Sequence, residues 1–210
     1  MTNKNWERDK QLIYSQGILP IDNVPINVID YLKNNISNIS HNHELAGQIK
    51  KEYRYQNWPK YVENFLLSFV NTQVMDPIIQ QAVNKIKITT KKKPYCVNHL
   101  WVNLQKKYEF NPVHSHSGVL SFIIFLKIPY NLDEEDKVFP KTSGEFSASR
   151  LCFLINDYMG DILELKINVD KSFENKMLLF PAKLNHLVYP FFTSDKERIT
   201  VSGNISINTD

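Results

Sequence analysis

The chain changes character at Lys91-Lys92-Lys93-Pro94. After this point, short runs rich in Val, Ile, Phe and Tyr alternate with turn residues, a pattern typical of β-strands. A series of strands with helices only in front of it predicts a mostly β, α+β fold, an antiparallel sandwich or barrel backed by N-terminal helices. The expected strands are 96–105, 112–116, 119–128, 144–147, 150–155, 161–166, 176–180, 185–191 and 197–206.

Three helices are expected in the first part of the chain. Apolar residues recur at helical spacing over 25–39 and over 61–70. A third helix begins at Asp76-Pro77, where the aspartate is the N-cap and the proline takes the first helical position. The 210 residues suit one domain with a sizeable core. We expect residues 1–95 to form a helical N-terminal layer and residues 96–210 to form the β core.

Composition excludes several classes of protein. The net charge of +3 is small, so it gives no reason to expect a nucleic-acid partner, although it permits an anionic ligand. No apolar run approaches the ~20 residues that span a membrane, and the N-terminus lacks the apolar core of a signal peptide. Two cysteines, Cys96 and Cys152, give no disulfide framework. The six glycines form no phosphate-binding loop. We expect a soluble cytoplasmic protein with no membrane partner.

An acidic segment lies between two of the expected strands. Residues 131–144 contain Asp133-Glu134-Glu135-Asp136, and we expect them to form an exposed loop. Such a loop is either a lid over a site or simply solvated surface.

Two histidines lie two residues apart in Asn111-Pro112-Val113-His114-Ser115-His116. Residues i and i+2 of a strand point to the same side, so His114 and His116 present two imidazoles together. This arrangement suits a metal ion. A polar strand edge is the alternative on this segment alone.

A third histidine follows a strand and a tight turn. Residues 177–190 indicate one strand, a turn after Phe180-Pro181, and a second strand that starts at His186. In a double-layered barrel the second strand brings His186 back to the first pair. On this segment alone, a lone histidine at a strand end is the favoured interpretation.

An arginine begins the last strand. Alternation places Arg198, Thr200 and Ser202 on one face of the strand and Ile199 and Val201 on the other. An arginine among apolar neighbours needs an anion, and its planar group matches a carboxylate. An internal salt bridge to Asp or Glu would satisfy it as well.

These segments together resemble a known family. The order His-x-His, Phe-Pro-x-x-x-x-His and an arginine twelve residues later is similar to that of the 2-oxoglutarate/Fe(II) oxygenases, whose core is a double-stranded β-helix, or jelly roll. The greatest similarity is to a prolyl-4-hydroxylase-like group common in phages and marine bacteria, and it covers residues 96–206. Other matching positions are Trp101, Asn103, Leu120, Ser121, Pro129, Gly144, Pro190 and Asn204.

The resemblance implies roles for six residues. His114, His116 and His186 would bind Fe(II). Arg198, helped by Thr200, would hold the far carboxylate of 2-oxoglutarate, and Asn103 would hydrogen-bond the same co-substrate. With O2 as the second co-substrate, the enzyme would hydroxylate a small-molecule or peptidyl substrate, a prolyl peptide being the first candidate, and release succinate and CO2. A phage-encoded protein acting in the host cytoplasm and a homodimer both fit this resemblance.

One position departs from the superfamily, and two alternatives stay open. Most members have Asp or Glu where this chain has His116. If His116 is not a ligand, only His114 and His186 would bind the metal. A three-histidine cupin dioxygenase would need no 2-oxoglutarate, but cupins usually have a glutamate where this chain has Leu120. A jelly-roll binding or virion module without catalysis is the alternative outside enzymes.

Overall fold

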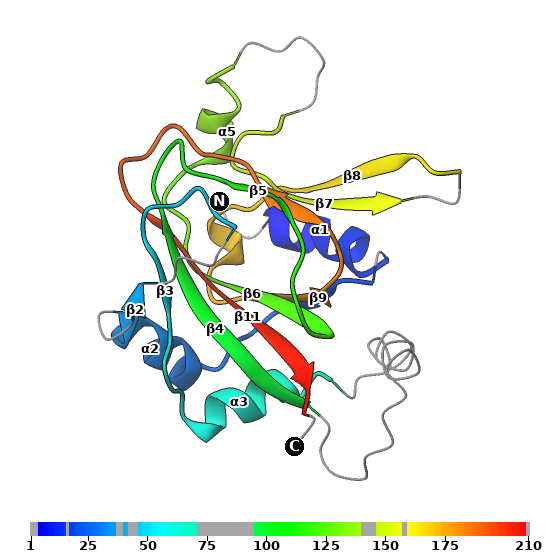
Figure 1. The fold of residues 1–210 in the computed structure, drawn as a ribbon. Helices are drawn as coiled ribbons and strands as arrows, with labels where there is room; N and C mark the ends of the chain where they lie inside the picture. Colours follow the sequence, from blue (N-terminus) through cyan, green and yellow to red (C-terminus); the bar gives the residue numbers. More distant parts are fainter. Residues whose placement is uncertain are drawn as a thin grey trace.

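Two antiparallel β-sheets face each other in a computed structural model that describes residues 4–15, 17–36, 40–41, 46–70, 95–139, 146–156 and 159–208 (Figure 1). The larger sheet has seven strands in the order β1-β9-β6-β11-β4-β3-β2, and the smaller has four in the order β5-β10-β7-β8. The strands are β1 (Leu19–Ile21), β2 (Ser40–His41), β3 (Glu52–Arg54), β4 (Tyr95–Gln105), β5 (Asn111–His114), β6 (Leu120–Lys127), β7 (Leu151–Asn156), β8 (Ile162–Ile167), β9 (Met177–Pro181), β10 (His186–Val188) and β11 (Arg198–Ile207).

Strand β11 forms the centre of the larger sheet. All of its residues pair with β4, from Arg198 opposite Gln105 to Ile207 opposite Tyr95, and its other edge pairs with β6. Successive side chains of a strand point to opposite faces of the sheet, so those of β11 alternate between the inside of the barrel and the outside. The predicted mostly β architecture with helices in front of it is therefore confirmed.

Helices cover the outside of the larger sheet. Helices α2 (Ile26–Asn34) and α3 (Lys60–Leu67) lie below this sheet in Figure 1. Their buried residues, such as Leu32 and Leu66, join one apolar cluster with Val201 of β11. Helix α1 (Lys4–Ser15) instead packs Trp6 edge-on against Phe173, with ring centroids 5.0 Å apart, in the cluster that fills the space between the sheets. No helix among the described residues is long and apolar enough to cross a membrane.

The first part of the chain also contributes strands that the sequence did not predict. Strands β1, β2 and β3 have only two or three residues each, too few for an alternating pattern to be visible. They extend the larger sheet at both edges. The helix predicted from Asp76 lies outside the described residues. Half of the strand predicted at 144–147 also lies outside them, and its described half, Phe146 and Ser147, is not in a strand.

The acidic segment is only in part the exposed loop that we expected: Asp133 and Glu134 are exposed, and residues 140–144 lie outside the described part of the chain. It forms a single helical turn, α5 (Leu132–Glu135), and Glu135 is fully buried. The Glu135 carboxylate accepts hydrogen bonds from the backbone N–H groups of Phe192 and Thr193 and from the Thr193 hydroxyl. The next residue, Asp136, pairs with the guanidinium of Arg150 through both oxygens. Glu135 thus holds the segment before β11 in place, and Asp136 supplies the counter-charge of the buried Arg150.

We predict that Glu135→Ala lowers the free energy of unfolding by about 3 kcal/mol, because it leaves three donors, the N–H groups of Phe192 and Thr193 and the Thr193 hydroxyl, without their acceptor. Thermal unfolding should show a melting temperature lower by about 6–12 °C. Glu134→Ala, on the exposed neighbour, is the matched control and should change stability by less than about 0.5 kcal/mol. Equal effects of the two substitutions would contradict a fastening role for Glu135.

Candidate metal centre

Three histidines from different segments meet between the two sheets. His114 ends β5, and His186 begins β10 directly opposite it in the antiparallel register. His116 lies two residues beyond the end of β5, where its backbone N–H donates to the carbonyl of Ala182 at 2.8 Å. One ring nitrogen from each of the three lies within 4.8 Å of the others. The structure thus brings the three predicted histidines together, although His116 arrives from a loop and not, as we expected, from the same strand as His114.

Backbone hydrogen bonds fix the orientation of two of the rings. His114 Nδ1 lies 2.7 Å from the carbonyl of Pro112, and His186 Nδ1 lies 3.0 Å from the carbonyl of Leu184. A carbonyl can only accept, so each Nδ1 is the donor and each Nε2 keeps its lone pair. Metal-binding histidines are commonly oriented by a hydrogen bond of this kind.

Burial keeps the three imidazoles neutral. It lowers the pKa of His186 to about 3 and the pKa of His116 to about 4, and it lowers the pKa of His114 as well. Neighbouring His114 adds to the effect on the other two. A metal ion binds the neutral form of imidazole, so no proton has to leave at neutral pH. Three neutral imidazoles suit iron among other transition metals, and the donor set therefore fits Fe(II).

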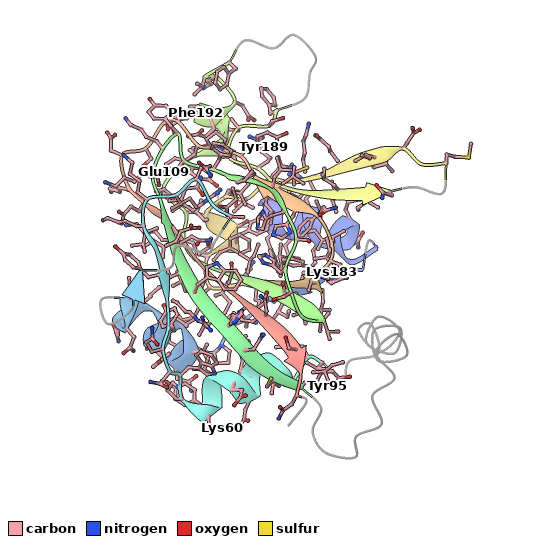
Figure 2. The ribbon with its side chains drawn as sticks, in the orientation of Figure 1. Lys60, Tyr95, Glu109, Lys183, Tyr189 and Phe192 are labelled. Carbon is pink, nitrogen blue, oxygen red and sulfur yellow. The ribbon has the colours of Figure 1, made fainter. Side chains whose placement is uncertain are left out.

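The histidines line a pocket enclosed by both sheets, with a volume of about 150 Å³. A single water molecule needs roughly 10–15 Å³ on a comparable measure, so the pocket has room for a small molecule beside a metal ion. Figure 2 shows the side chains that crowd the space between the sheets. The residues of the lining are Ala46, Gly47, Glu52, Trp101, Asn103, Gln105, Asn111, His114, Ser115, His116, Ile123, Phe125, Leu151, Val169, His186, Val188, Arg198, Thr200 and Ser202.

Arg198 lies in this pocket, as the alternation along β11 predicted. Its side chain is 4% exposed, and every described hydrogen-bond partner of it is neutral. The guanidinium donates to Gln105 Oε1 through two nitrogens, and its Nη1 also donates to the Tyr130 hydroxyl at 3.1 Å and the Ser149 carbonyl at 3.2 Å. No salt bridge joins Arg198 to an acid within the described residues, so the internal ion pair that the sequence left open is not found there.

Thr200 and Asn103 lie side by side on the floor of the pocket. They are register partners on β11 and β4, and both contribute to the lining. Asn103 is buried, and its Oδ1 has no hydrogen-bond partner among the described residues. Trp101 lies on the same face of β4, with its ring centroid 5.3 Å from that of His116. These positions agree with the alternation expected for the two strands.

The sequence did not point to several other residues of the pocket. Gln105 continues the alternation of Trp101 and Asn103 along β4, and that signal could have found it. Glu52 of β3 and Asn111 of β5 gave no such signal, because they come from strands of three and four residues. Burial, with a smaller contribution from the charge of Glu109, raises the pKa of Glu52 to about 7.

The position where a cupin has its glutamate adds no ligand. Leu120 begins β6 and is fully buried in the cluster outside the larger sheet. Its side chain therefore points away from the three histidines.

Comparison with solved structures identifies the fold. A prolyl-4-hydroxylase from Pseudomonas putida superposes with a TM-score of 0.50 at 12% identity, covering 96% of this chain and 98% of that one. HygX from Streptomyces hygroscopicus, solved with nickel, 2-oxoglutarate and hygromycin B bound, superposes with a TM-score of 0.51 at 9% identity and covers 96% and 88%. The predicted double-stranded β-helix is thereby confirmed. No curated protein matches the chain by sequence.

The sequence itself carries the pattern of a protein family. Residues 99–204, just over half of the chain, match the family described as "Putative 2OG-Fe(II) oxygenase". This range includes all three histidines and Arg198. The cofactor of this family is Fe(II), and its co-substrates are 2-oxoglutarate and O2. The chain therefore belongs to the 2-oxoglutarate- and Fe(II)-dependent oxygenases.

Proposed function

We propose that this oxygenase is a hydroxylase in which His114, His116 and His186 hold Fe(II) and Arg198 binds the far carboxylate of 2-oxoglutarate. One observation carries the proposal: a buried arginine with no acidic partner in the described chain lines the same pocket as three neutral histidines. The first feature calls for an anion and the second for a cation. 2-Oxoglutarate bound to Fe(II) supplies both.

A second buried arginine makes the argument for Arg198 sharper. Arg150 is also 4% exposed, but its guanidinium meets both oxygens of Asp136, and it does not line the pocket. Burying a charge is costly unless an opposite charge accompanies it. Arg150 has such a partner in the protein. Arg198 has none among the described residues, so a ligand carboxylate is its natural counter-charge.

The neighbours of Arg198 prepare it for a carboxylate. Gln105 and Tyr130 hold the planar guanidinium in one orientation before any ligand arrives. A group that is already ordered loses less entropy when it binds. We propose that the Thr200 hydroxyl adds a hydrogen bond to the same carboxylate and that Asn103, next to it across the sheet, hydrogen-bonds the co-substrate.

Fe(II) held by His114, His116 and His186 would supply the activation of O2, by which one oxygen atom would enter the substrate and the other would enter succinate as 2-oxoglutarate loses CO2. The chain contributes binding, orientation and exclusion of water. Apolar side chains from both sheets, Ile123, Phe125, Leu151, Val169 and Val188, form the dry part of the pocket. They strengthen the attraction between Arg198 and a carboxylate because they lower the local dielectric constant.

The substrate class follows from resemblance and is part of the proposal. The motifs of the chain are similar to those of the prolyl-4-hydroxylase-like group of phages and marine bacteria, so a prolyl peptide is the first substrate to test. If a prolyl peptide is not the substrate, we propose another peptide or a small molecule. We further propose that residues 1–210 act as one oxygenase domain, in which residues 1–95 form a mainly helical layer around the core of residues 96–210.

We predict that His186→Ala weakens Mn(II) binding by more than about 100-fold, since the loss of an outer hydrogen-bond partner alone costs 10–100-fold. Electron paramagnetic resonance of Mn(II) measures the free metal directly. His99→Gln, on β4 outside the pocket, is the control and should leave the affinity unchanged. His116→Asp should retain the metal, because most of the superfamily has a carboxylate there. Unchanged affinity in His186→Ala would refute the proposed ligand set.

We predict that Arg198→Lys raises the KM for 2-oxoglutarate about 10–100-fold, because an ammonium cannot make the paired hydrogen bonds of a guanidinium. Release of succinate from Fe(II)-loaded protein measures this effect. Arg150→Lys is the matched control: it should lower the melting temperature without changing the KM. An unchanged KM for 2-oxoglutarate in Arg198→Lys, or no release of succinate by the wild type, would contradict the proposal.

A further inference from the structure

One end of the pocket carries two oxygen acceptors that lie close together. Glu52 comes from β3 at the side of the larger sheet, and Asn111 comes from the start of β5 in the smaller sheet. Gly47 packs directly over both of them. A Cβ atom at position 47 would overlap both Glu52 Oε1 and Asn111 Oδ1, so these two oxygens surround one small space next to Gly47.

One acceptor lacks a donor and the other lacks a counter-charge in the described part of the protein. Asn111 is 9% exposed, and its Oδ1 has no hydrogen-bond partner there. Glu52 is 4% exposed, and no cation among the described residues lowers the pKa of its carboxyl group. Buried acceptors normally have donors and buried charges have partners, so an unsatisfied acceptor beside an unpaired carboxylate indicates that a ligand supplies both.

The electrostatics of the pocket point to the charge of that ligand. Glu52 is the acidic residue of the described lining and Arg198 is its cationic residue, since the three histidines are neutral. Glu109, which lies toward the end of the barrel opposite Lys60 in Figure 2, adds a second negative charge near Glu52. The nearby Lys51 is occupied, because its ammonium pairs with Glu197 at 3.1 Å. A cation at this end would therefore be attracted, and an anion would be repelled.

We propose that Glu52 and Asn111 form a subsite for a cationic nitrogen of the substrate, an ammonium or a guanidinium group. This inference rests on the proposed function of the same pocket, and it names the chemical class that the substrate contains. Such a group carries several N–H donors and a positive charge, so it satisfies the Asn111 carbonyl and the Glu52 carboxylate at once.

The subsite also separates the two ligands of the enzyme. On the larger sheet, Glu52 pairs in register with Asn103, which pairs with Thr200, and Arg198 follows two residues away on the same face. Glu52 repels the dianionic co-substrate, whereas Arg198 repels a cationic substrate. The opposite charges thus direct each ligand to its own side of the pocket.

Matched probes test the charge preference. N-acetyl-L-arginine amide and N-acetyl-L-citrulline amide have nearly the same shape, but only the first is cationic. Calorimetry on the protein loaded with Mn(II) and N-oxalylglycine should show at least about tenfold tighter binding of the arginine derivative, equivalent to about 1.4 kcal/mol. Equal affinity of the two probes, or no binding of either, would overturn the proposal.

Three variants locate the preference. Glu52→Gln should abolish it, and Gly47→Ala should reduce it as well, because the added methyl group displaces both oxygens. Glu109→Gln removes the same charge nearby without altering the lining, so it should keep most of the preference. A preference that survives in Glu52→Gln, or that disappears equally in Glu109→Gln, would overturn the assignment to Glu52.

Substrate-free succinate release separates this inference from the proposed function. If all variants still release succinate from 2-oxoglutarate and the probes bind equally, the cation subsite is wrong while the proposed function stands. If no succinate is released by the wild type but the arginine derivative still binds through Glu52, the proposed function fails and the subsite stands.

A stability measurement tests Glu52 without any ligand. Burial raises the pKa of Glu52 from 4.5 to about 7, so folding favours the protonated form and the buried charge costs stability as the pH rises. The described groups facing it are Glu109, which is acidic, and the neutral Asn103 and Asn111. Glu52→Gln should therefore melt above the wild type at pH 8 and level with it below pH 4.5. A wild type that is the more stable protein at pH 8 would show that Glu52 already has a cationic partner, and would overturn the proposal.

Discussion

The pairing of β11 with β4 and β6 is the constraint on which the pocket depends. It fixes Arg198 opposite Gln105 and Thr200 opposite Asn103, and it turns all four side chains to the inside of the barrel. Gly203 allows this close packing, since a Cβ there would overlap the ring of Phe122 and the carbonyl of His99. A shift of one residue in this register would place Ile199 and Val201 in the pocket and Arg198 in the apolar layer outside.

The smaller sheet supplies the opposite wall and works by different means. Its pairing sets His186 against His114, but His116 depends on a loop bonded to the turn between β9 and β10. His186 is buried and His114 and His116 are half-buried, and the three rings place one nitrogen each within 4.8 Å of the others, an arrangement that suits a cation. In the same way, the charge of Arg198 is poorly satisfied without an anion. We propose that a metal ion and the carboxylates of 2-oxoglutarate fill these two adjacent sites of opposite preference together.

Sequence patterns predicted the residues that repeat with the period of a strand. The strand series, the face shared by Arg198 and Thr200, and the partnership of Trp101 with Asn103 all follow from alternation. The patterns failed where tertiary contacts decide the outcome. Glu135 lies in an acidic run that resembles solvated surface, yet it is buried and accepts hydrogen bonds from the backbone of Phe192 and Thr193, far along the chain.

Short elements were the second source of failure. Strand β3 is too short to show a period, so no sequence pattern indicates that Glu52 reaches the pocket. His116 was correctly predicted to lie beside His114, but the reason was wrong. We expected both histidines on one strand, whereas β5 ends at His114 and His116 lies in the loop that follows. Residues of this kind are positioned by contacts between distant segments, and a pattern within one segment carries no information about them.

A crystal structure of the protein soaked with Mn(II) and N-oxalylglycine, an inert mimic of 2-oxoglutarate, would show where the metal and the co-substrate bind. We expect Mn(II) to bind the Nε2 atoms of His114, His116 and His186, and the far carboxylate of the mimic to pair with both terminal nitrogens of Arg198. A metal bound elsewhere, or a carboxylate that makes no contact with Arg198, would contradict the account.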